Sequence, residues 1–384
     1  MIHEYLYGPK REIRGIITRR SMIHMDIAKE KHFYRLQETT TATWPVIERL
    51  VQEQLKNNDV PELSTHLEVF LAKRRNKPLL RPYLTRLAYE AVGGSDWRSI
   101  AHVLAASELL NISTYQSNMC FDEKNADWQN TSASNQFIAA MISLSLAFHA
   151  IDAQPDLTQR QKAAAMAILA HSNEEVYVGQ FLDINRLSLR SVRTYLEQLD
   201  VEFLKDYVHR CRLIGGSMIT ISLMGACAVD PDHAAIPILR RLFEAFGIGG
   251  QMLNDLADYI PAGERPYTAA YGDLLMGRLT YPTFILARAS HGVTQIDNLK
   301  VNQNRTELCT SATSFLKDVN IARLVSQLIK AECWRDIQSS LGDLSDILPS
   351  EQISALSFIR YYMFENKILR YFIKARSVHM EGVL

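Results

Sequence analysis

The strongest chemical signal in the sequence is the segment GQMLNDLADY, which contains Asn254, Asp255 and Asp258. Residues three and four apart are neighbours on a helix, so these three side chains are predicted to share one face. Two carboxylates and an amide oxygen suit Mg²⁺ that is also held by water and by a substrate phosphate. An aspartate pair on a solvated helix is the ordinary alternative. The apolar, glycine-rich residues just before the segment favour a buried helix, on which the carboxylates need a metal ion or a basic partner.

Three further segments carry polar residues with related chemistry. In MGRLTYP, Arg278 follows a glycine, and such a junction offers a cation and backbone N–H groups to a phosphate. Taken alone, this arginine is better explained as a solvated residue after a glycine turn. In GQFLD, Gln180 and Asp183 share a predicted helix face. A long apolar helix ends in NMCFDE, which contains Asn118 and Asp122.

These segments, in this order, resemble the trans-polyprenyl diphosphate synthase family of α-helical isoprenoid synthases. The run GIGGQMLNDLADY is similar to that family's second aspartate-rich motif, GRLTYPT to its GK-x-T-x-P segment and GQFLD to its GQxxD. KPLLRP, which contains Lys77 and Arg81, resembles the GKRxRP opening, and SELLNISTYQSNMCFDE resembles the ELxHxxxLxHDDxxDE helix. The resemblance covers about residues 70–290.

The resemblance implies an all-α fold, a single large isoprenoid-synthase-type helical bundle with a central active-site cavity. It also implies a prenyl diphosphate substrate and Mg²⁺ ions that bridge the two aspartate-rich motifs and the diphosphate. The residues implied as metal ligands are Asn118, Asp122, Asp183, Asn254, Asp255 and Asp258. Those implied to bind the diphosphate are Lys77, Arg81, Gln180 and Arg278. The implied catalytic residues are Asp122, Asp255 and Asp258.

Several positions depart from the family pattern. Asn118 and Met119 replace two of the three aspartates of the first motif, and a thioether is a poor ligand for Mg²⁺. The expected arginine pair falls on Asp127 and Trp128, and the lysine of the expected Lys-Thr-Gly segment falls on Ile214. A carboxylate a few ångströms from a diphosphate costs about 4 kcal/mol at an effective dielectric constant near 20. Efficient elongation with isopentenyl diphosphate is therefore not favoured.

Three functions follow from this pattern. The favoured one is a class I terpene synthase, which cyclises or eliminates from a single prenyl diphosphate. The alternative is a polyprenyl diphosphate synthase or prenyltransferase that elongates a chain or uses an unusual acceptor. A further alternative is a catalytically inactive regulatory subunit. Because the family assembles as dimers, we expect a homodimer, or a heterodimer with an active prenyl synthase. Retention of Asp255, Asp258 and Arg278 is an argument against the inactive subunit.

The elements that position these residues are predicted to be helices, because apolar residues recur at three- and four-residue intervals and strand patterns are scarce. The sequence predicts an irregular N-terminal arm over 1–41, a helical core over 42–290 and a helical extension of the same domain over 291–384. The predicted helices cover 45–56, 62–73, 80–92, 97–117, 135–151, 159–172, 187–198, 201–228, 235–260, 268–289, 311–340 and 350–376.

Composition narrows the protein class. The 384 residues include 42 basic and 42 acidic side chains, and this balance excludes nucleic-acid binding by bulk charge. Five scattered cysteines without a CxxC pair indicate reduced thiols in a cytoplasmic protein. The basic first twenty residues lack the apolar centre of a signal peptide but are compatible with organellar targeting. The uncharged runs 137–151 and 213–229 are shorter than the roughly 20 residues that span a membrane, so no transmembrane segment is expected.

Overall fold

The computed structural model describes most of the chain, and its regular structure is helical. The described residues are 19–56, 67–68, 71, 74–75, 77–121, 132–188, 191–197, 200–259, 272–289, 314–315 and 319–365. Within these ranges the one β-bridge joins Ser188 to Arg278. The predicted all-α fold is confirmed.

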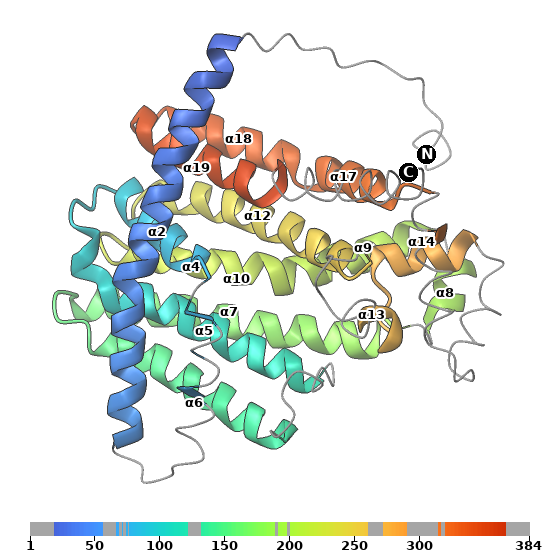
Figure 1. Ribbon diagram of the computed structural model, residues 1–384, viewed down its shortest axis with the longest axis horizontal. Coiled ribbons are helices and arrows are strands. Elements are labelled where there is room, and N and C mark those ends of the chain that lie inside the picture. Colours follow the sequence, from blue (N-terminus) through green and yellow to red (C-terminus); the bar gives the residue numbers. More distant parts are fainter. Residues whose placement is uncertain are drawn as a thin grey trace, which may run out of the picture.

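The elements follow one another along the chain and pack mainly as neighbouring helices (Figure 1). They are α2 (Arg19–Lys56), α4 (Leu80–Ala91), the 3₁₀ turn η1 (Trp97–Ile100), α5 (Ala101–Phe121), α6 (Ala133–Asp152), α7 (Gln159–Asn185), α8 (Val192–Glu197), α9 (Asp200–Cys211), the π-helical turn η4 (Arg212–Gly216), α10 (Ser217–Thr220), the 3₁₀ turn η5 (Ile221–Leu223), α11 (Met224–Cys227), α12 (Ile236–Ala257), α13 (Gly272–Leu275), α14 (Tyr281–Ala289), α17 (Ile321–Glu332), α18 (Trp334–Ser345), α19 (Ser350–Arg360) and the π-helical turn η7 (Tyr361–Glu365). In Figure 1, α5, α6, α7, α10 and α12 run side by side, and α2 crosses them at a steep angle.

Several predicted helix boundaries hold within a few residues. These are the helices predicted over 80–92, 97–117, 135–151, 201–228 and 235–260. The predicted helix over 159–172 continues to Asn185, and the one over 268–289 is two helices, α13 and α14. The prediction over 62–73 lies largely outside the described residues.

The prediction of an irregular arm is wrong from Arg19 onward, because residues 19–56 form one helix. The β-branched run TTTAT, residues 39–43, has low helix propensity and weakened the helical signal. In the structure the hydroxyls of Thr39, Thr40 and Thr43 donate to carbonyls four residues earlier, and the three side chains are buried. Packing against α4 and α5 therefore overrides local propensity.

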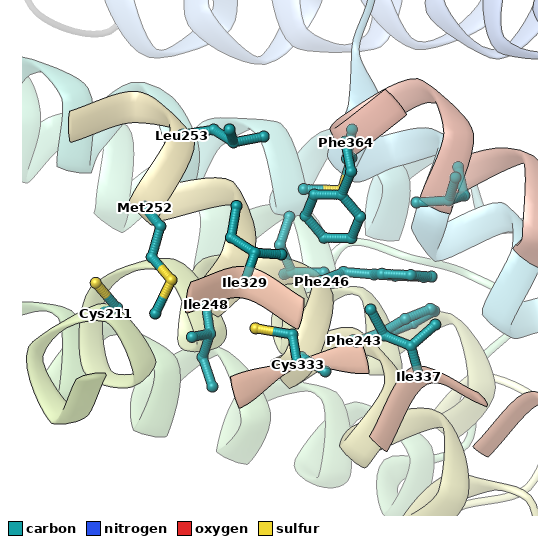
Figure 2. Close-up of a cluster of buried hydrophobic side chains, with 14 of the residues drawn as sticks. Cys211, Phe243, Phe246, Ile248, Met252, Leu253, Ile329, Cys333, Ile337 and Phe364 are labelled. Carbon is teal, nitrogen blue, oxygen red and sulfur yellow. The ribbon is translucent and has the colours of Figure 1, made fainter. Parts of the chain in front are cut away.

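The C-terminal helices belong to the main hydrophobic core. Figure 2 shows Phe246 of α12 among side chains from α17, α18 and η7, including Ile329, Ile337 and Phe364. The Phe246 and Phe364 ring centroids lie 6.0 Å apart. Apolar burial of this kind is the dominant favourable term in folding. Within the predicted helix over 350–376, residues 350–365 are helical and pack on this core.

One helix in the described ranges, Ala133–Asp152, is long and apolar enough to cross a membrane. Half of its most apolar window is buried inside the structure. The second uncharged run, residues 213–229, is buried in α10, α11 and their neighbouring turns. Length and composition therefore give only weak evidence for a membrane span.

Close backbone contacts hold α7, η4 and α12 together. A Cβ atom on Gly215 of η4 would lie 2.3 Å from the carbonyl oxygen of Gly247 in α12. A Cβ atom on Gly247 would in turn lie 2.1 Å from the carbonyl oxygen of Gly215. On the other side of η4, a Cβ atom on Gly179 of α7 would lie 2.8 Å from Cβ of Leu213. Glycine is required here because the helix backbones meet without side chains between them.

This contact predicts that Gly247→Ala lowers the free energy of unfolding by about 3 kcal/mol, since the added methyl meets a backbone carbonyl that cannot swing away. Gly342→Ala on α18 is the matched control, because nothing lies within 4 Å of the place that its methyl group would take. The control should stabilise the helix by about 0.5–1 kcal/mol. Urea denaturation of both variants measures the difference, and equal stabilities would contradict the close approach.

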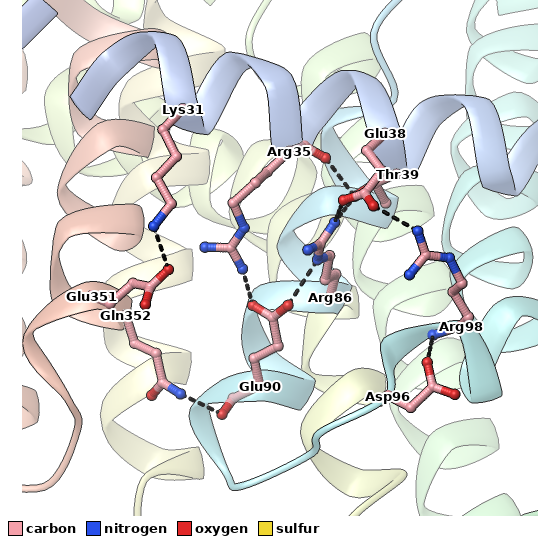
Figure 3. A network of polar contacts seen from close by, with 10 residues as sticks. All are labelled: Lys31, Arg35, Glu38, Thr39, Arg86, Glu90, Asp96, Arg98, Glu351 and Gln352. Atoms are coloured by element: carbon pink, nitrogen blue, oxygen red, sulfur yellow. Dashed lines mark hydrogen bonds and ion pairs between the residues drawn. The ribbon is translucent and has the colours of Figure 1, made fainter. Parts of the chain in front are cut away.

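A polar network ties α2 to α4, η1 and α19 (Figure 3). Arg86 of α4 is at its centre, with Nη1 2.7 Å from Glu38 Oε2 and Nε 2.8 Å from Glu90 Oε1. Arg35 also pairs with Glu90, and Arg98 Nη2 lies 2.6 Å from Glu38 Oε1. Because Arg35 and Glu38 of α2 form ion pairs with residues of α4 and η1, the position of α2 on the bundle is fixed by charge as well as by apolar packing.

The histidine beside this network gives stability a pH dependence. His32 of α2 is buried with Nε2 3.1 Å from Ser354 Oγ. Burial, together with Arg35 and Lys31, lowers the pKa of His32 to about 4. The folded state therefore keeps a neutral imidazole at pH values where the unfolded chain is already protonated. Stability that is present above pH 6.5 is lost as the pH falls toward 4.

We predict that the free energy of unfolding of the native protein falls by about 2 kcal/mol more than that of His32→Gln between pH 7 and pH 5. Denaturant titrations at the two pH values measure this difference directly. Parallel pH dependence in the two proteins would show that the imidazole does not take part.

Candidate functional site

Four charged side chains from α7, α9, α12 and the segment before α14 meet in one buried group. Arg210 is at the centre, with Nε 2.8 Å from Asp183 Oδ1 and Nη1 2.7 Å from Asp255 Oδ2. Arg278 Nε lies 3.5 Å from Asp183 Oδ2. All four side chains are at most 7% exposed. This group, called the Arg210 cluster below, places two positive charges against two negative ones.

Both carboxylate oxygens of Asp255 already accept hydrogen bonds. The Tyr207 hydroxyl donates to Oδ2 at 2.8 Å, as does Arg210 Nη1, and Gln251 Nε2 donates to Oδ1 at 2.9 Å. Burial, with Asp255 beside it, raises the pKa of Tyr207 well above 10, so the phenol remains a donor. Burial alone would lower the pKa of Arg210, but Asp183 and Asp255 outweigh it and raise that pKa.

Arg278 is positioned by the backbone around it. Ser188, just after α7, forms a β-bridge with Arg278, and Leu279 N–H donates to the Leu187 carbonyl at 2.8 Å. Gly277 has a φ of +71°, a left-handed conformation that favours glycine and turns the chain into this bridge. The glycine and arginine of GRLTYP therefore work together to bring a cation beside α7, so Arg278 is not the solvated residue that the segment alone favoured.

The predicted shared face of α12 splits in the structure. Asp255 is buried, whereas Asn254 is exposed, because adjacent residues on a helix point roughly 100° apart. Asp258 is half-buried and accepts the Asp273 N–H through Oδ2 at 3.2 Å. The expectation that Asn254 and Asp255 act together on one face is therefore wrong, and Asp258 joins the end of α12 to α13.

The first motif approaches α7 through the end of α5. Ser117 Oγ lies 2.8 Å from the Tyr177 hydroxyl, and Tyr177 is about one turn before Gln180 on α7. Asn118, the residue after Ser117, is half-buried. Gln180 is buried. Asp122, Asp127 and Trp128 lie outside the described residues, so their predicted roles remain predictions.

A second group of arginines lies beside α5. Arg74 Nη2 is 2.6 Å from Glu108 Oε1, to which Asn111 Nδ2 also donates at 2.8 Å. Burial lowers the pKa of Arg81 to about 10, with Arg74 adding to this effect and Glu108 opposing it. The Nε atoms of Arg74 and Arg81 are buried and make no hydrogen bond to the described residues. Lys77, predicted to bind diphosphate, is exposed.

Sequence reasoning missed Arg210, Tyr207 and Arg74. A usable signal was present for the first two, because Phe203, Tyr207, Arg210 and Ile214 follow one another at spacings of three and four residues. An arginine on such a stripe is placed inside the bundle and needs carboxylate partners. Arg74 gave no comparable signal, since it lies in a basic run, KRR, that is typical of solvated surface.

The fit to Mg²⁺ differs among the predicted ligands. The part of the chain that the structure describes has no group of three or more His, Cys, Asp or Glu side chains arranged to hold a metal. Asp183 and Asp255 do not fit a divalent ion as they stand, because arginines neutralise both and the oxygens of Asp255 already accept three hydrogen bonds. Asn118, Asn254 and Asp258 remain predicted ligands.

Comparison with known proteins agrees with this architecture. No protein-family model matches the chain. The chloroplastic geranylgeranyl pyrophosphate synthase of Capsicum annuum is 27% identical over 218 residues, which are 54% of this chain and 56% of that protein. The sequence match therefore spans only about half the length of this curated relative.

The similar solved structures are prenyl synthases. The geranylgeranyl pyrophosphate synthase of Lactobacillus brevis superposes with a TM-score of 0.66 at 18% identity, covering 87% of this chain and 98% of that one. The enzyme of the same name from Pyrococcus horikoshii gives 0.67 at 17%, with the same coverage. The polyprenyl synthase of Caulobacter crescentus, complexed with calcium and isoprenyl diphosphate, gives 0.65 at 16%, covering 85% and 95%.

At these identities the superpositions establish the fold. The chain has the all-α fold of the trans-polyprenyl diphosphate synthases, and its predicted resemblance to that family is confirmed.

Proposed function

We propose that this protein is an enzyme that acts on prenyl diphosphates as a prenyltransferase of the polyprenyl diphosphate synthase type. The observation that carries the proposal is the presence of two separate groups of arginines, one buried and one half-buried. Arg210 and Arg278 lie between α7 and α12, and Arg74 and Arg81 lie beside α5. Chain elongation handles two diphosphates, an allylic donor and isopentenyl diphosphate, whereas a terpene synthase ionises one.

The comparisons support this function over the terpene synthase favoured by the sequence pattern. The curated relative is named as a geranylgeranyl pyrophosphate synthase, and the similar structures are named as geranylgeranyl, heptaprenyl, decaprenyl or polyprenyl synthases. Each of these names describes the synthesis of a prenyl diphosphate.

Arg278 is proposed to meet the leaving diphosphate of the allylic substrate. Asp183 lies closer to Arg210 than to Arg278, at 2.8 Å against 3.5 Å, so Arg210 compensates more of its charge. Asp183 thus shares its single negative charge between the two arginines. A guanidinium prearranged in a buried site stabilises developing negative charge without reorganisation.

Arg74 and Arg81 are proposed to bind the second diphosphate. Their two positive charges exceed the single negative charge of Glu108, and guanidinium groups match phosphate geometry well. Arg74 thereby supplies positive charge near a segment in which the family's lysine is displaced to the exposed Lys77. This additional cation offsets part of the repulsion expected from Asp127.

Dimer formation is proposed to use the outer face of α6. Phe137, Ile138 and Met141 are 42%, 52% and 42% exposed on this helix. Neighbouring α7 exposes Phe181 to 69%. Apolar side chains gathered in this way are typical of a protein interface. A second copy of the chain, or an active homologue, is the proposed occupant.

The reaction test incubates the full chain and Mg²⁺ with geranyl, farnesyl or geranylgeranyl diphosphate, with and without isopentenyl diphosphate. We expect a longer prenyl diphosphate, detected by mass spectrometry, only when isopentenyl diphosphate is present. Hydrocarbon or alcohol formed without isopentenyl diphosphate would contradict the proposal and indicate a terpene synthase. Activity that appears only beside another prenyl synthase would indicate the regulatory subunit.

A variant pair locates the second diphosphate in the same assay. Arg81→Gln should raise the KM for isopentenyl diphosphate at least tenfold and leave the KM for the allylic substrate within about twofold. Arg75→Gln is the control, because Arg75 is 60% exposed and pairs with Glu48 on α2. Equal changes in both KM values would argue against a separate acceptor site.

A further inference from the structure

The Arg210 cluster lies where the family resemblance implies metal ions, yet its charges already balance. Asp183 and Asp255 together carry two negative charges, and Arg210 and Arg278 carry two positive ones. The cluster is buried, so a divalent cation added to it would leave an excess of two positive charges in a region of low dielectric constant. Coulomb attraction therefore gives such an ion no net reason to enter.

The hydrogen bonds that Asp255 accepts also argue against a metal ion in this cluster. Its Oδ2 accepts from Tyr207 and Arg210, and its Oδ1 accepts from Gln251. Both lone pairs of Oδ2 are therefore in use, and a metal ion on this oxygen would displace one of its two donors. Tyr207 and Arg210 are themselves buried, so a displaced donor would be left without a hydrogen bond to water, which is energetically costly.

The chain position of Arg210 connects it to a departure in the sequence. The family's Lys-Thr-Gly lysine falls on Ile214, and Arg210 precedes that position by four residues on the same continuous helical rod. The π-helical turn η4 begins between them, and its Gly215 contacts the backbone of Gly247 in α12. This close approach brings α12 near enough for one guanidinium to reach Asp183 and Asp255 at once.

We propose that Arg210 is a resident cation that takes the place of a metal ion between α7 and α12, so that Asp183 and Asp255 do not ligate Mg²⁺ in this protein. Arg210 acts as a positioning residue that holds the two carboxylates and, through Asp183, the neighbouring Arg278. Any divalent ion that the enzyme uses binds to other residues. The proposal concerns the resting protein and does not depend on turnover.

Mn²⁺ binding to the full chain tests this assignment without any prenyl substrate. Protein freed of metal with EDTA is titrated with Mn²⁺, and the free ion is counted by electron paramagnetic resonance. Asp255→Asn should leave Mn²⁺ affinity within about twofold of the native protein. A tenfold or greater loss would overturn the proposal, because Asp255 would then be a ligand.

Removal of the resident cation should create a metal site. Arg210→Gln leaves two buried carboxylates without their shared partner, so we expect Mn²⁺ to bind at least tenfold more tightly than to the native protein and to raise the thermal midpoint. Arg212→Gln is the matched control, since Arg212 is 53% exposed and pairs with Glu244; its Mn²⁺ affinity should not change. No gain of binding by a folded Arg210→Gln would overturn the proposal.

Two further comparisons keep the proposal testable if the Arg210→Gln variant is unstable. If Arg210→Gln does not fold, Arg210→Lys keeps the positive charge and should bind Mn²⁺ like the native protein, while the Asp255→Asn comparison still decides the outcome. Because no arm measures product, a protein that lacks prenyltransferase activity would still confirm or overturn the role of Arg210.

Discussion

The pairing of Arg210 with Asp183 and Asp255 is the interaction on which the rest of the site depends. A buried guanidinium is tolerated only when carboxylates surround it, and buried carboxylates need cations in return. The two aspartates come from α7 and α12, so the ion pairs fix the spacing of these helices. The glycine contacts at η4 make that spacing possible, because any side chain between Gly215 and Gly247 would push the backbones apart. The ion pairs of Arg210 therefore depend on the close packing of η4 against α12.

Much of the fold can be predicted from the amino-acid sequence. Apolar periodicity predicts the helices. The family resemblance implies that the ends of α7, α12 and the GRLTYP segment converge, and the structure brings Asp183, Asp255 and Arg278 together around Arg210. The sequence indicated that Asp255 needs a metal ion or a basic partner, but it did not identify Arg210, 45 positions away, as that partner. It also obscured α2, in which tertiary packing stabilises a threonine-rich helix of weak local propensity.

The two arginine groups explain how a chain with a degenerate first motif can still resemble a prenyl synthase. Negative charge expected of metal ligands is partly missing at Asn118 and partly neutralised at Asp183 and Asp255. Arg74 and Arg210 supply positive charge, and neither lies on one of the segments that resemble the family motifs. Under the proposed function, diphosphate recognition relies less on metal ions and more on guanidinium groups, which bind phosphate through charge and directed hydrogen bonds.

A double-mutant cycle between Arg210 and Asp255 tests this account most directly. The free energies of unfolding are measured for the native protein, Arg210→Met, Asp255→Leu and the double variant. A buried, hydrogen-bonded ion pair predicts a coupling energy of about 3 kcal/mol, whereas the exposed pair of Arg212 and Glu244 should give about 0.5 kcal/mol in a parallel cycle. A coupling energy below about 0.5 kcal/mol for Arg210 and Asp255 would contradict the central claim.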